Sequence, residues 1–462
     1  SRELVETPSG VNDAYRPYLG WRPWTTNYGI PDRTTFKVYV KAGETIYLGS
    51  SVHQSYLDAD NGETAVSEWD IVVTSPTDVV YRLNVVNGGS GHIDSPEKER
   101  RGPKPLDSGG YDPLVIDAGE TGWWTVEFHG EKNQYSVGTL DPVAKKADEP
   151  WGTQNANIAA WDVTVADSDG NEKKGRMYST FLSISTGWGE APIHSRFYVL
   201  TKDGYLYKVH LNGIKPYGFI VFANNRGFID ATTGETLNRS VLFENIGGSS
   251  KIRPEANIVF QNPALEDDID VTHRLFLNPP SEDLPEDWLA PIPVPEPAEV
   301  AFQGRTANKA VVGEGGKFRF TIGEETDDID EEPDASRRFT FQLIIDADQD
   351  GEYEASDGAG DIVIDSVAKP GLNEIEWNGK RKNGTDVPVG NYTAKIMMKG
   401  GEYHFPMFDV EKAENGIKIE ALNAPGGYPS DKNNFFIYYN DLSYTTGSGF
   451  YMNLDGSGGH TP

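Results

Sequence analysis

Acidic residues at regular spacing between residues 346 and 357 are the clearest chemical signal in the sequence. Asp346, Asp348 and Asp350 occupy alternate positions, Gly351 follows them, and Asp357 stands at the twelfth position counted from Asp346. Calcium takes six to eight hard oxygen ligands at about 2.3–2.6 Å, and alternate carboxylates before a turn-forming glycine supply such ligands. The spacing therefore predicts a calcium site whose ligands are the side chains of Asp346, Asp348, Asp350 and Asp357 and the backbone carbonyl of Glu352.

This pattern resembles the twelve-residue calcium loop of EF-hands and its non-helical relatives. The residues before it, Phe339 to Ile345, have the composition of a β-strand, so the flanking helices of an EF-hand are absent. We therefore expect a calcium loop framed by strands, without the role of a sensor. A solvated acidic hairpin is the alternative, and either Glu354 or Asp361 could replace one of the five ligands.

Two other acidic stretches carry weaker signals. The stretch from Asp167 to Gly170 has only part of the pattern, and its twelfth position is Tyr178, so a plain β-turn is favoured over a metal site. The stretch from Glu324 to Glu332 concentrates like charge, which predicts a solvated loop. Binding of further divalent ions is the alternative for this second stretch.

Aromatic residues crowd the first thirty positions, and exposed rings of this kind can stack on sugar faces. Tyr18, Trp21 and Trp24 are the candidate glycan-binding residues. The alternative, which we favour, is that these rings pack as a flap over the first domain. Trp123, Trp161 and Trp377 lie inside predicted strands and are expected in hydrophobic cores.

Motifs of common enzymes are absent from the sequence. It has no His-Glu-x-x-His zinc motif, no Gly-x-Ser-x-Gly nucleophile turn and no cysteine, and its 8 histidines are scattered. We expect no enzymatic activity. A catalytic pair of carboxylates stays open as an alternative, because 71 acidic residues make chance pairs inevitable and the separation that matters is spatial.

Strands must position these candidate groups, because hydrophobic periodicity of the helical kind is hard to find. Five segments alternate between apolar and polar residues as half-buried strands do. They are Thr35 to Val40, Glu68 to Val73, Gly122 to Phe128, Trp161 to Val165 and Phe197 to Leu200. Glycine-containing turns separate them. A chain with 37% hydrophobic and 11% aromatic residues suits thin β-domains in which large rings supply most of the burial.

A chain of 462 residues is long enough for about three domains. We predict an all-β protein of tandem β-sandwich modules, jelly-roll and Ig-like, joined by short Pro-rich and acidic linkers. The predicted domains are a jelly-roll-like sandwich over 1–150, a second β domain over 151–295, an Ig-like sandwich with the calcium loop over 296–411, and a further module or C-terminal extension over 412–462. Two strands expected in the last range, Gly416 to Glu420 and Phe435 to Tyr439, cannot bury a core alone, so they either begin a missing module, which we favour, or add to a neighbouring domain.

The segment 298–410 contains Trp377, the turn of Asn383 and Gly384, and the Pro388-x-Gly390-x-Tyr392 motif. In these three elements it resembles the Ig-like domain of the flagellar hook-scaffolding protein family. The resemblance implies that the tryptophan fills a sandwich core. Residues 1–150 loosely resemble a pre-peptidase-type jelly-roll module in Ala42 to Gly49, Trp69 to Pro76 and Ala118 to Val126. In the long interruption of this module, Gly88 to Pro113, we expect a mobile excursion.

Net charge and the length of apolar runs limit which partners and which location the sequence predicts. The formal net charge of −30 disfavours binding to nucleic acid and to anionic membranes. The sequence has no run of about 18 apolar residues, so we expect no insertion of this segment into a bilayer. We predict a secreted, non-enzymatic structural or adhesive protein of a bacterial cell surface or surface filament, stabilised by calcium. Its partners would be other surface proteins, copies of itself, or glycans. A carbohydrate-binding surface module and an accessory region of a secreted hydrolase are the alternatives.

Overall fold

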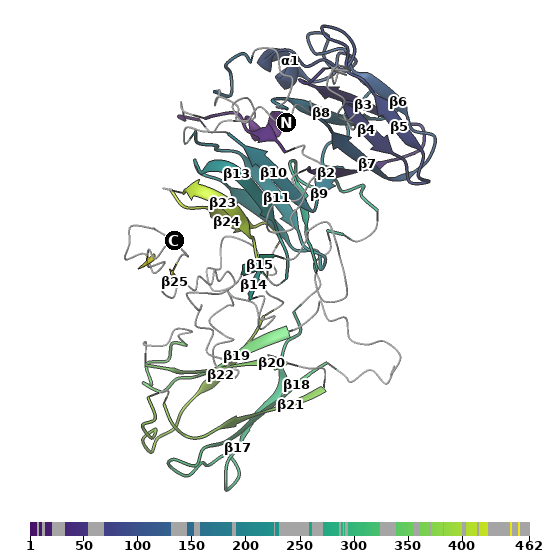
Figure 1. The fold of residues 1–462 in the computed structure, drawn as a ribbon. Helices are drawn as coiled ribbons and strands as arrows, with labels where there is room; N and C mark the ends of the chain where they lie inside the picture. Colours follow the sequence, from purple (N-terminus) through teal and green to yellow (C-terminus); the bar gives the residue numbers. More distant parts are fainter. Residues whose placement is uncertain are drawn as a thin grey trace.

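The computed structural model shows two lobes (Figure 1). It describes residues 1–6, 9–11, 14–20, 33–53, 69–130, 146–151, 158–186, 191–225, 227–230, 258–260, 271–285, 288–289, 291, 294–323, 339–353, 360–368, 371–381, 383–399, 403–413, 415–423, 444–445 and 451–452. Nearly all its regular structure is antiparallel β-sheet, which confirms the all-β prediction. No helix in these ranges has the length and apolar character that a membrane crossing requires.

A nine-stranded sheet forms the centre of the larger lobe. Its strands, in spatial order, are β24 (Lys418–Ala421), β12 (Leu206–His210), β11 (Arg196–Leu200), β16 (Arg274–Phe276), β9 (Met177–Ser179), β2 (Thr35–Val40), β7 (Gly122–Phe128), β4 (Ile71–Thr74) and β5 (Val80–Leu83). Burial alternates along β2 as the sequence predicts, because successive side chains of a strand point to opposite faces. Its buried residues Phe36, Val38 and Val40 therefore line one face of the sheet.

Two smaller sheets cover this apolar face. One consists of β6 (Leu114–Asp117), β3 (Thr45–Ser50) and β8 (Trp161–Ala166), and the other of β1 (Tyr18–Leu19), β10 (Phe181–Ser185), β13 (Lys215–Phe222) and β23 (Met407–Lys412). Trp161 of β8 is 1% exposed, and its ring stacks on Phe36 of β2 with centroids 4.5 Å apart. Trp161 is a core residue, as predicted. Trp123 lies on the opposite face of the large sheet, half-buried and stacked on Trp288.

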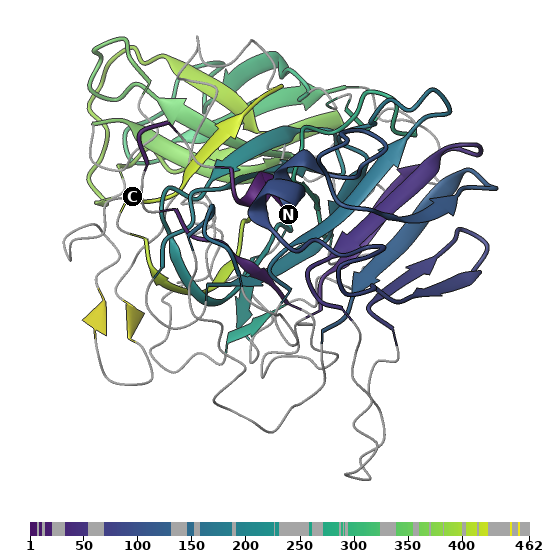
Figure 2. The ribbon, with the colours of Figure 1, turned by 90° about the horizontal axis from the view of Figure 1, so that it is seen from above.

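The excursion between residues 88 and 113 packs against the larger lobe instead of extending from it. It contains α1 (Pro96–Arg101), the one α-helix among the described residues, which begins directly after the N-cap Ser95. Ile93 and Tyr111 are buried, and Glu99 of α1 accepts a hydrogen bond from the Ser1 hydroxyl. Figure 2 shows α1 beside the N-terminus, where the 3₁₀-helix η1 (Arg2–Leu4) lies. The expectation of a mobile excursion is wrong because these buried anchors fix it.

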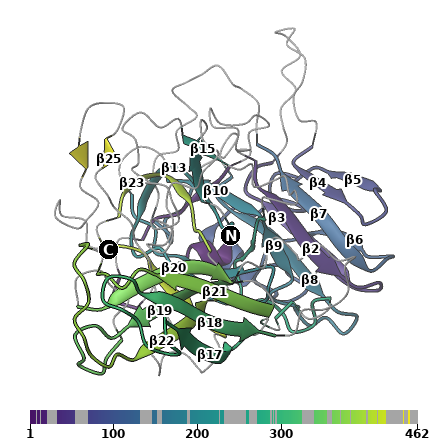
Figure 3. The ribbon, with the colours of Figure 1, turned by 90° about the horizontal axis from the view of Figure 1, so that it is seen from below.

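The smaller lobe is a sandwich of two three-stranded sheets. One sheet has the order β17 (Ala298–Gln303), β18 (Gly316–Ile322), β21 (Gly371–Trp377), and the other has the order β20 (Ile362–Ala368), β19 (Phe339–Ile345), β22 (Ala394–Lys399). Phe320 and Phe341 meet between the sheets with ring centroids 4.9 Å apart. Trp377, expected in this core, is half-buried at its edge and contacts Phe318. Figure 3 shows the smaller lobe to one side of strands β2 to β9.

After the smaller lobe the chain returns to the larger one. β23 pairs with β13, and β24 pairs with β12 through register pairs that include Val209 with Ile419. The smaller lobe is therefore inserted between β16 and β23. The first strand expected after residue 412 adds to a neighbouring sheet, which is the alternative that the sequence left open. The second, Phe435 to Tyr439, lies outside the described residues.

Sheets also cross the predicted boundary near residue 150. β3 pairs with β8 over six residues on each strand, and β2 pairs with β9. Ranges 1–150 and 151–295 thus share sheets and one hydrophobic core. Two further antiparallel pairs are β14 (Phe228–Asp230) with β15 (Ile258–Phe260), and β25 (Tyr444–Thr445) with β26 (Tyr451–Met452).

Candidate metal site

Strand β19 carries the predicted calcium loop at its C-terminal end. It is the central strand of its sheet, and its residues from Thr340 to Ile345 pair with both β20 and β22. Its residues from Phe341 to Ile345 are buried. A strand held in this way fixes the position of the residue that follows it. Asp346 is that residue, and its amide donates a hydrogen bond to the Thr393 carbonyl at 3.0 Å.

Asp346 forms the buried wall of the site. The residue is 5% exposed. Its Oδ2 accepts hydrogen bonds from the Gly351 amide at 3.2 Å and the Thr393 hydroxyl at 3.4 Å. Its Oδ1 is also buried, but it accepts no hydrogen bond from the described residues. A buried carboxylate oxygen without a donor is costly, because burial removes its hydration and nothing replaces it.

Asp348 and Asp350 complete an acidic cluster at the surface. Ligand oxygens of these two exposed residues and of Asp346 all lie within 4.8 Å of one another. Left-handed backbone at Gln349 and at Gly351, with φ of 66° and 85°, folds the loop back so that alternate aspartates converge. The structure thus brings together three of the four carboxylates that the sequence predicts.

The remaining predicted ligands are placed only in part. Glu352 is exposed, and its amide donates to Oδ1 of Asp350 at 2.8 Å. Asp357 and Glu354 lie outside the described residues. Asp361 holds the base of the loop, where its Oδ1 accepts a hydrogen bond from the Ala347 amide at 3.1 Å.

The donor set fits a hard divalent cation. All ligand atoms available in the cluster are oxygens, which suit calcium, magnesium or manganese and not the softer metals that favour imidazole or thiolate. A cation beside Oδ1 of Asp346 would supply the positive charge that this buried oxygen lacks among the described residues. Asp346, Asp348 and Asp350 are the side chains that would hold it.

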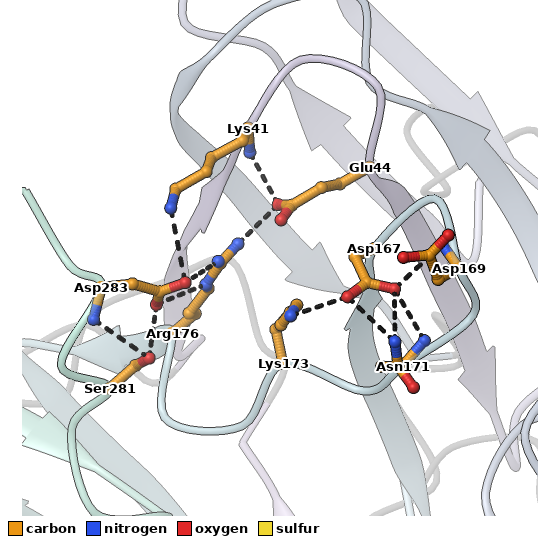
Figure 4. A network of polar contacts seen from close by, with 9 residues as sticks. All are labelled: Lys41, Glu44, Asp167, Asp169, Asn171, Lys173, Arg176, Ser281 and Asp283. Atoms are coloured by element: carbon orange, nitrogen blue, oxygen red, sulfur yellow. Dashed lines mark hydrogen bonds and ion pairs between the residues drawn. The ribbon is translucent and has the colours of Figure 1, made fainter.

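The second acidic stretch is a turn closed by its own hydrogen bonds. Oδ1 of Asp167 accepts hydrogen bonds from the amides of Asp169 and Asn171, at 3.0 and 2.8 Å, and Lys173 lies 2.7 Å from Oδ2 (Figure 4). The hydrogen bonds from Lys173 and from the amide of Asn171 hold the pKa of Asp167 well below its usual range. This carboxylate is occupied by protein donors, as expected for a β-turn.

An ion-pair network around a buried arginine, beside this turn, was not predicted. Arg176, whose side chain is 1% exposed, donates to the carboxylates of Glu44 and Asp283, and Lys41 also lies near Asp283 (Figure 4). The burial of Arg176 opposes its charge, but its hydrogen bonds to Asp283 and Glu44 outweigh that effect and raise its pKa. The network joins three segments that are distant in sequence, which is a structural role.

A second unpredicted cluster lies where the chain returns from the smaller lobe. The Tyr403 hydroxyl donates a hydrogen bond to the Asp203 carboxylate, and the Tyr403 ring contacts the ring of His273. Burial and the charge of Asp203 raise the pKa of Tyr403, whereas burial lowers the pKa of His273 to about 3. The cluster fastens residues 403–405 to the hairpin of β11 and β12.

Tyr18 does not offer a sugar-binding surface. It is 4% exposed and packs in an apolar cluster with Ile93, Tyr111 and Trp151, and its burial raises its pKa to about 12. A ring enclosed on both faces cannot stack on a sugar, so the glycan-binding assignment of Tyr18 is corrected to a packing role. Trp21 and Trp24 lie outside the described residues.

Comparisons with known proteins do not place the chain in a family. No protein-family model matches it, and no curated protein gives a significant match. Among solved structures, a DUF4785 family protein from Legionella pneumophila is 9% identical, and the alignment covers 88% of this chain and 99% of that one. Its TM-score is 0.15, which is too low to support an argument about fold or function.

Proposed function

We propose that this protein is a calcium-stabilised, non-enzymatic structural or adhesive protein of a bacterial cell surface or surface filament. The observation that carries the calcium part is the buried Oδ1 of Asp346, which belongs to a cluster with two further carboxylates and accepts no hydrogen bond from the described residues. Calcium at this position would neutralise a cluster of like charges and replace the missing donor. Asp357 and the carbonyl of Glu352 remain the proposed further ligands.

The exposure of two of the three carboxylates favours a site of moderate affinity. Calcium sites with dissociation constants of about 0.1–1 mM are typical of extracellular modules, where calcium is abundant. The absence of cysteine from the chain means that no disulfide stabilises the smaller lobe, so a metal ion would supply that stabilisation instead. These two features support a secreted location, in which the partners would be other surface proteins, copies of the chain or glycans.

The insertion of the smaller lobe supports a scaffold whose calcium-bearing sandwich is a side arm. β24 returns the chain to the nine-stranded sheet that β16 left, and β23 joins the four-stranded sheet beside β13, so the larger lobe is continuous without the sandwich. One end of the sandwich carries the aspartate loop; the last residue of β19 and the first residues of β20 and β22 lie there. The chain enters at Ala298 and leaves after Lys399 at the opposite end. The loop therefore points away from both connections.

Calorimetric melting with calcium and with chelator tests the calcium part of the proposal. Calcium at a hundredfold excess over its dissociation constant would stabilise the folded lobe by about 2.7 kcal/mol, because it binds the native loop and not the unfolded chain. We expect a higher transition temperature for the smaller lobe in millimolar calcium. Identical melting curves in calcium and in chelator would reject the site.

A pair of variants with the same change of charge distinguishes calcium binding at this site from non-specific screening of an acidic protein by calcium. Asp346→Asn removes a ligand charge from the cluster, and an asparagine oxygen can still accept the hydrogen bonds from Gly351 and Thr393. Asp169→Asn makes the same change on an exposed turn. We expect the first variant to lose the calcium-induced shift and the second to keep it.

A further inference from the structure

Arg381 connects the two ends of the aspartate loop. One of its terminal nitrogens donates to the Gly360 carbonyl at 2.6 Å, and the other donates to the Ala347 carbonyl at 2.8 Å. Ala347 follows Asp346 at the start of the loop, and Gly360 precedes Asp361 at its end. A single side chain from the connection between β21 and β22 therefore closes the loop at its base.

We propose that Arg381 is a positioning residue that preforms the calcium site, an inference that rests on the calcium role proposed above. Because Arg381 ties Ala347 to Gly360 through protein hydrogen bonds, the loop is closed before an ion arrives. Calcium then binds the carboxylates of Asp346, Asp348 and Asp350 where they already lie together, so less conformational entropy is lost on binding. Partners that orient metal ligands commonly change metal affinity by about 10–100-fold when they are removed.

Gly360 contributes to the same arrangement from the backbone. Its φ is +111°, and a Cβ atom at this position would lie 2.2 Å from Oδ2 of Asp348. Only glycine lets the returning chain approach the carboxylate of Asp348 so closely. Arg381 thus holds Gly360 against the acidic cluster, and Gly360 leaves room for one of its ligands.

The charge of Arg381 and its hydrogen bonds have opposite effects on calcium affinity. The direction in which affinity changes in a variant therefore tests the proposal. A positive charge near the cluster repels calcium, so removing the charge alone would strengthen binding. Loss of the two hydrogen bonds would weaken binding by loosening the loop. Arg381→Met removes both, and Arg381→Lys keeps the charge but loses the fork that reaches two carbonyls.

Isothermal titration of the whole chain with calcium chloride is the decisive experiment, at a temperature where circular dichroism shows each variant to be folded. We expect Arg381→Met and Arg381→Lys to raise the calcium dissociation constant about tenfold or more. Gly360→Ala, which keeps every charge, should also weaken binding. Gly323→Ala is the matched control, because Gly323 also has a positive φ, +54°, and a Cβ atom there would meet no described atom within 4 Å.

The possible results separate this proposal from the calcium role itself. Tighter or unchanged binding by Arg381→Met, with calcium still bound by the wild type, would overturn the positioning role and leave the calcium site intact. Binding by Gly360→Ala equal to that of Gly323→Ala would also overturn it. No heat of calcium binding to the wild type would overturn both proposals.

Discussion

The buried side chain of Arg176 pairs with the partly exposed carboxylate of Asp283, a residue 107 positions later in the sequence. The same guanidinium contacts Glu44, which directly precedes β3, so one side chain joins the start of β3 to the segment that leads toward the smaller lobe. The side chain of Glu44 is 9% exposed. Its charge depends on Arg176 for compensation, because water has little access to it.

Arg176→Met is expected to lower the free energy of unfolding of the larger lobe by about 3–5 kcal/mol. The physical reason is that the substitution leaves the carboxylate of Glu44 buried without its cation. Urea denaturation followed by tryptophan fluorescence measures this effect, since every tryptophan except Trp377 precedes the smaller lobe.

Arg196→Met is the matched control for this change. Arg196 pairs with Glu6 at 2.7 Å, but both side chains are more than one third exposed. Its loss should cost at most about 1 kcal/mol, because water screens the pair and rehydrates the remaining charge. Equal destabilisation by the two variants would contradict the role assigned to the Arg176 network.

The stability of the larger lobe should decrease as the pH falls below about 6.5, because His273 is buried as a neutral ring. Burial, together with the positive charges of Lys202 and Arg274, lowers the pKa of His273 from 6.5 to about 3. Its Nδ1 also accepts a hydrogen bond from the Lys202 amide, which a proton on that atom would abolish. Between these pH values the unfolded chain binds a proton that the folded chain does not, so the stabilisation is fully present above the unfolded pKa and declines toward the folded one.

His273→Gln is the variant that isolates this group. The expected slope due to one such histidine is at most about 1.4 kcal/mol per pH unit, and the variant should have a flatter profile between about pH 6.5 and about pH 5. Denaturant midpoints measured at several pH values give the slope. If His273→Gln has the same slope as the wild type in this range, groups other than His273 cause the pH dependence.

Magnesium should replace calcium poorly at the aspartate loop. Magnesium requires near-ideal octahedral geometry at about 2.0–2.1 Å and releases its water reluctantly, whereas calcium tolerates irregular sets of oxygens. The cluster combines one buried carboxylate with two exposed ones, an uneven set of oxygens that suits the flexible coordination of calcium. We expect equal concentrations of magnesium to give a smaller rise in the melting temperature of the smaller lobe than calcium gives. Equal shifts would indicate charge neutralisation without a defined coordination site.

Local patterns allowed part of this structure to be predicted. Strand β19 and the aspartate loop after it were found from sequence because neighbours along the chain determine both, through alternation and through turn-forming residues. The helix α1 had a local signal as well, in the N-cap Ser95 and the following Pro96. It was missed because its charged residues carry no apolar periodicity.

Long-range relationships could not be predicted in the same way. Arg176 follows a glycine before a short strand, and nothing in that context distinguishes a buried arginine from an exposed one. The pairing of β24 with β12 joins residues about two hundred positions apart, and strand alternation does not specify the partner. The burial of Oδ1 of Asp346 and the two hydrogen bonds that Arg381 donates across the aspartate loop likewise depend on tertiary contacts.

Tyr403→Phe should weaken the attachment of the returning chain to the larger lobe. The Tyr403 hydroxyl is the donor to Asp203, and hydrogen bonds to charged groups contribute roughly 1.5–3 kcal/mol. Tyr392→Phe removes a hydroxyl that donates to the Pro388 carbonyl at an exposed position, and it should have little effect. Hydrogen exchange of the Leu206 amide, which donates to the side chain of Asn423, reports on the attachment directly. We expect faster exchange at Leu206 in Tyr403→Phe than in Tyr392→Phe, because Tyr403 and Asn423 both bind the turn between β11 and β12, through Asp203 and Gly204. Equal exchange rates would mean that the pairing of β24 with β12 holds the returning chain without help from Tyr403.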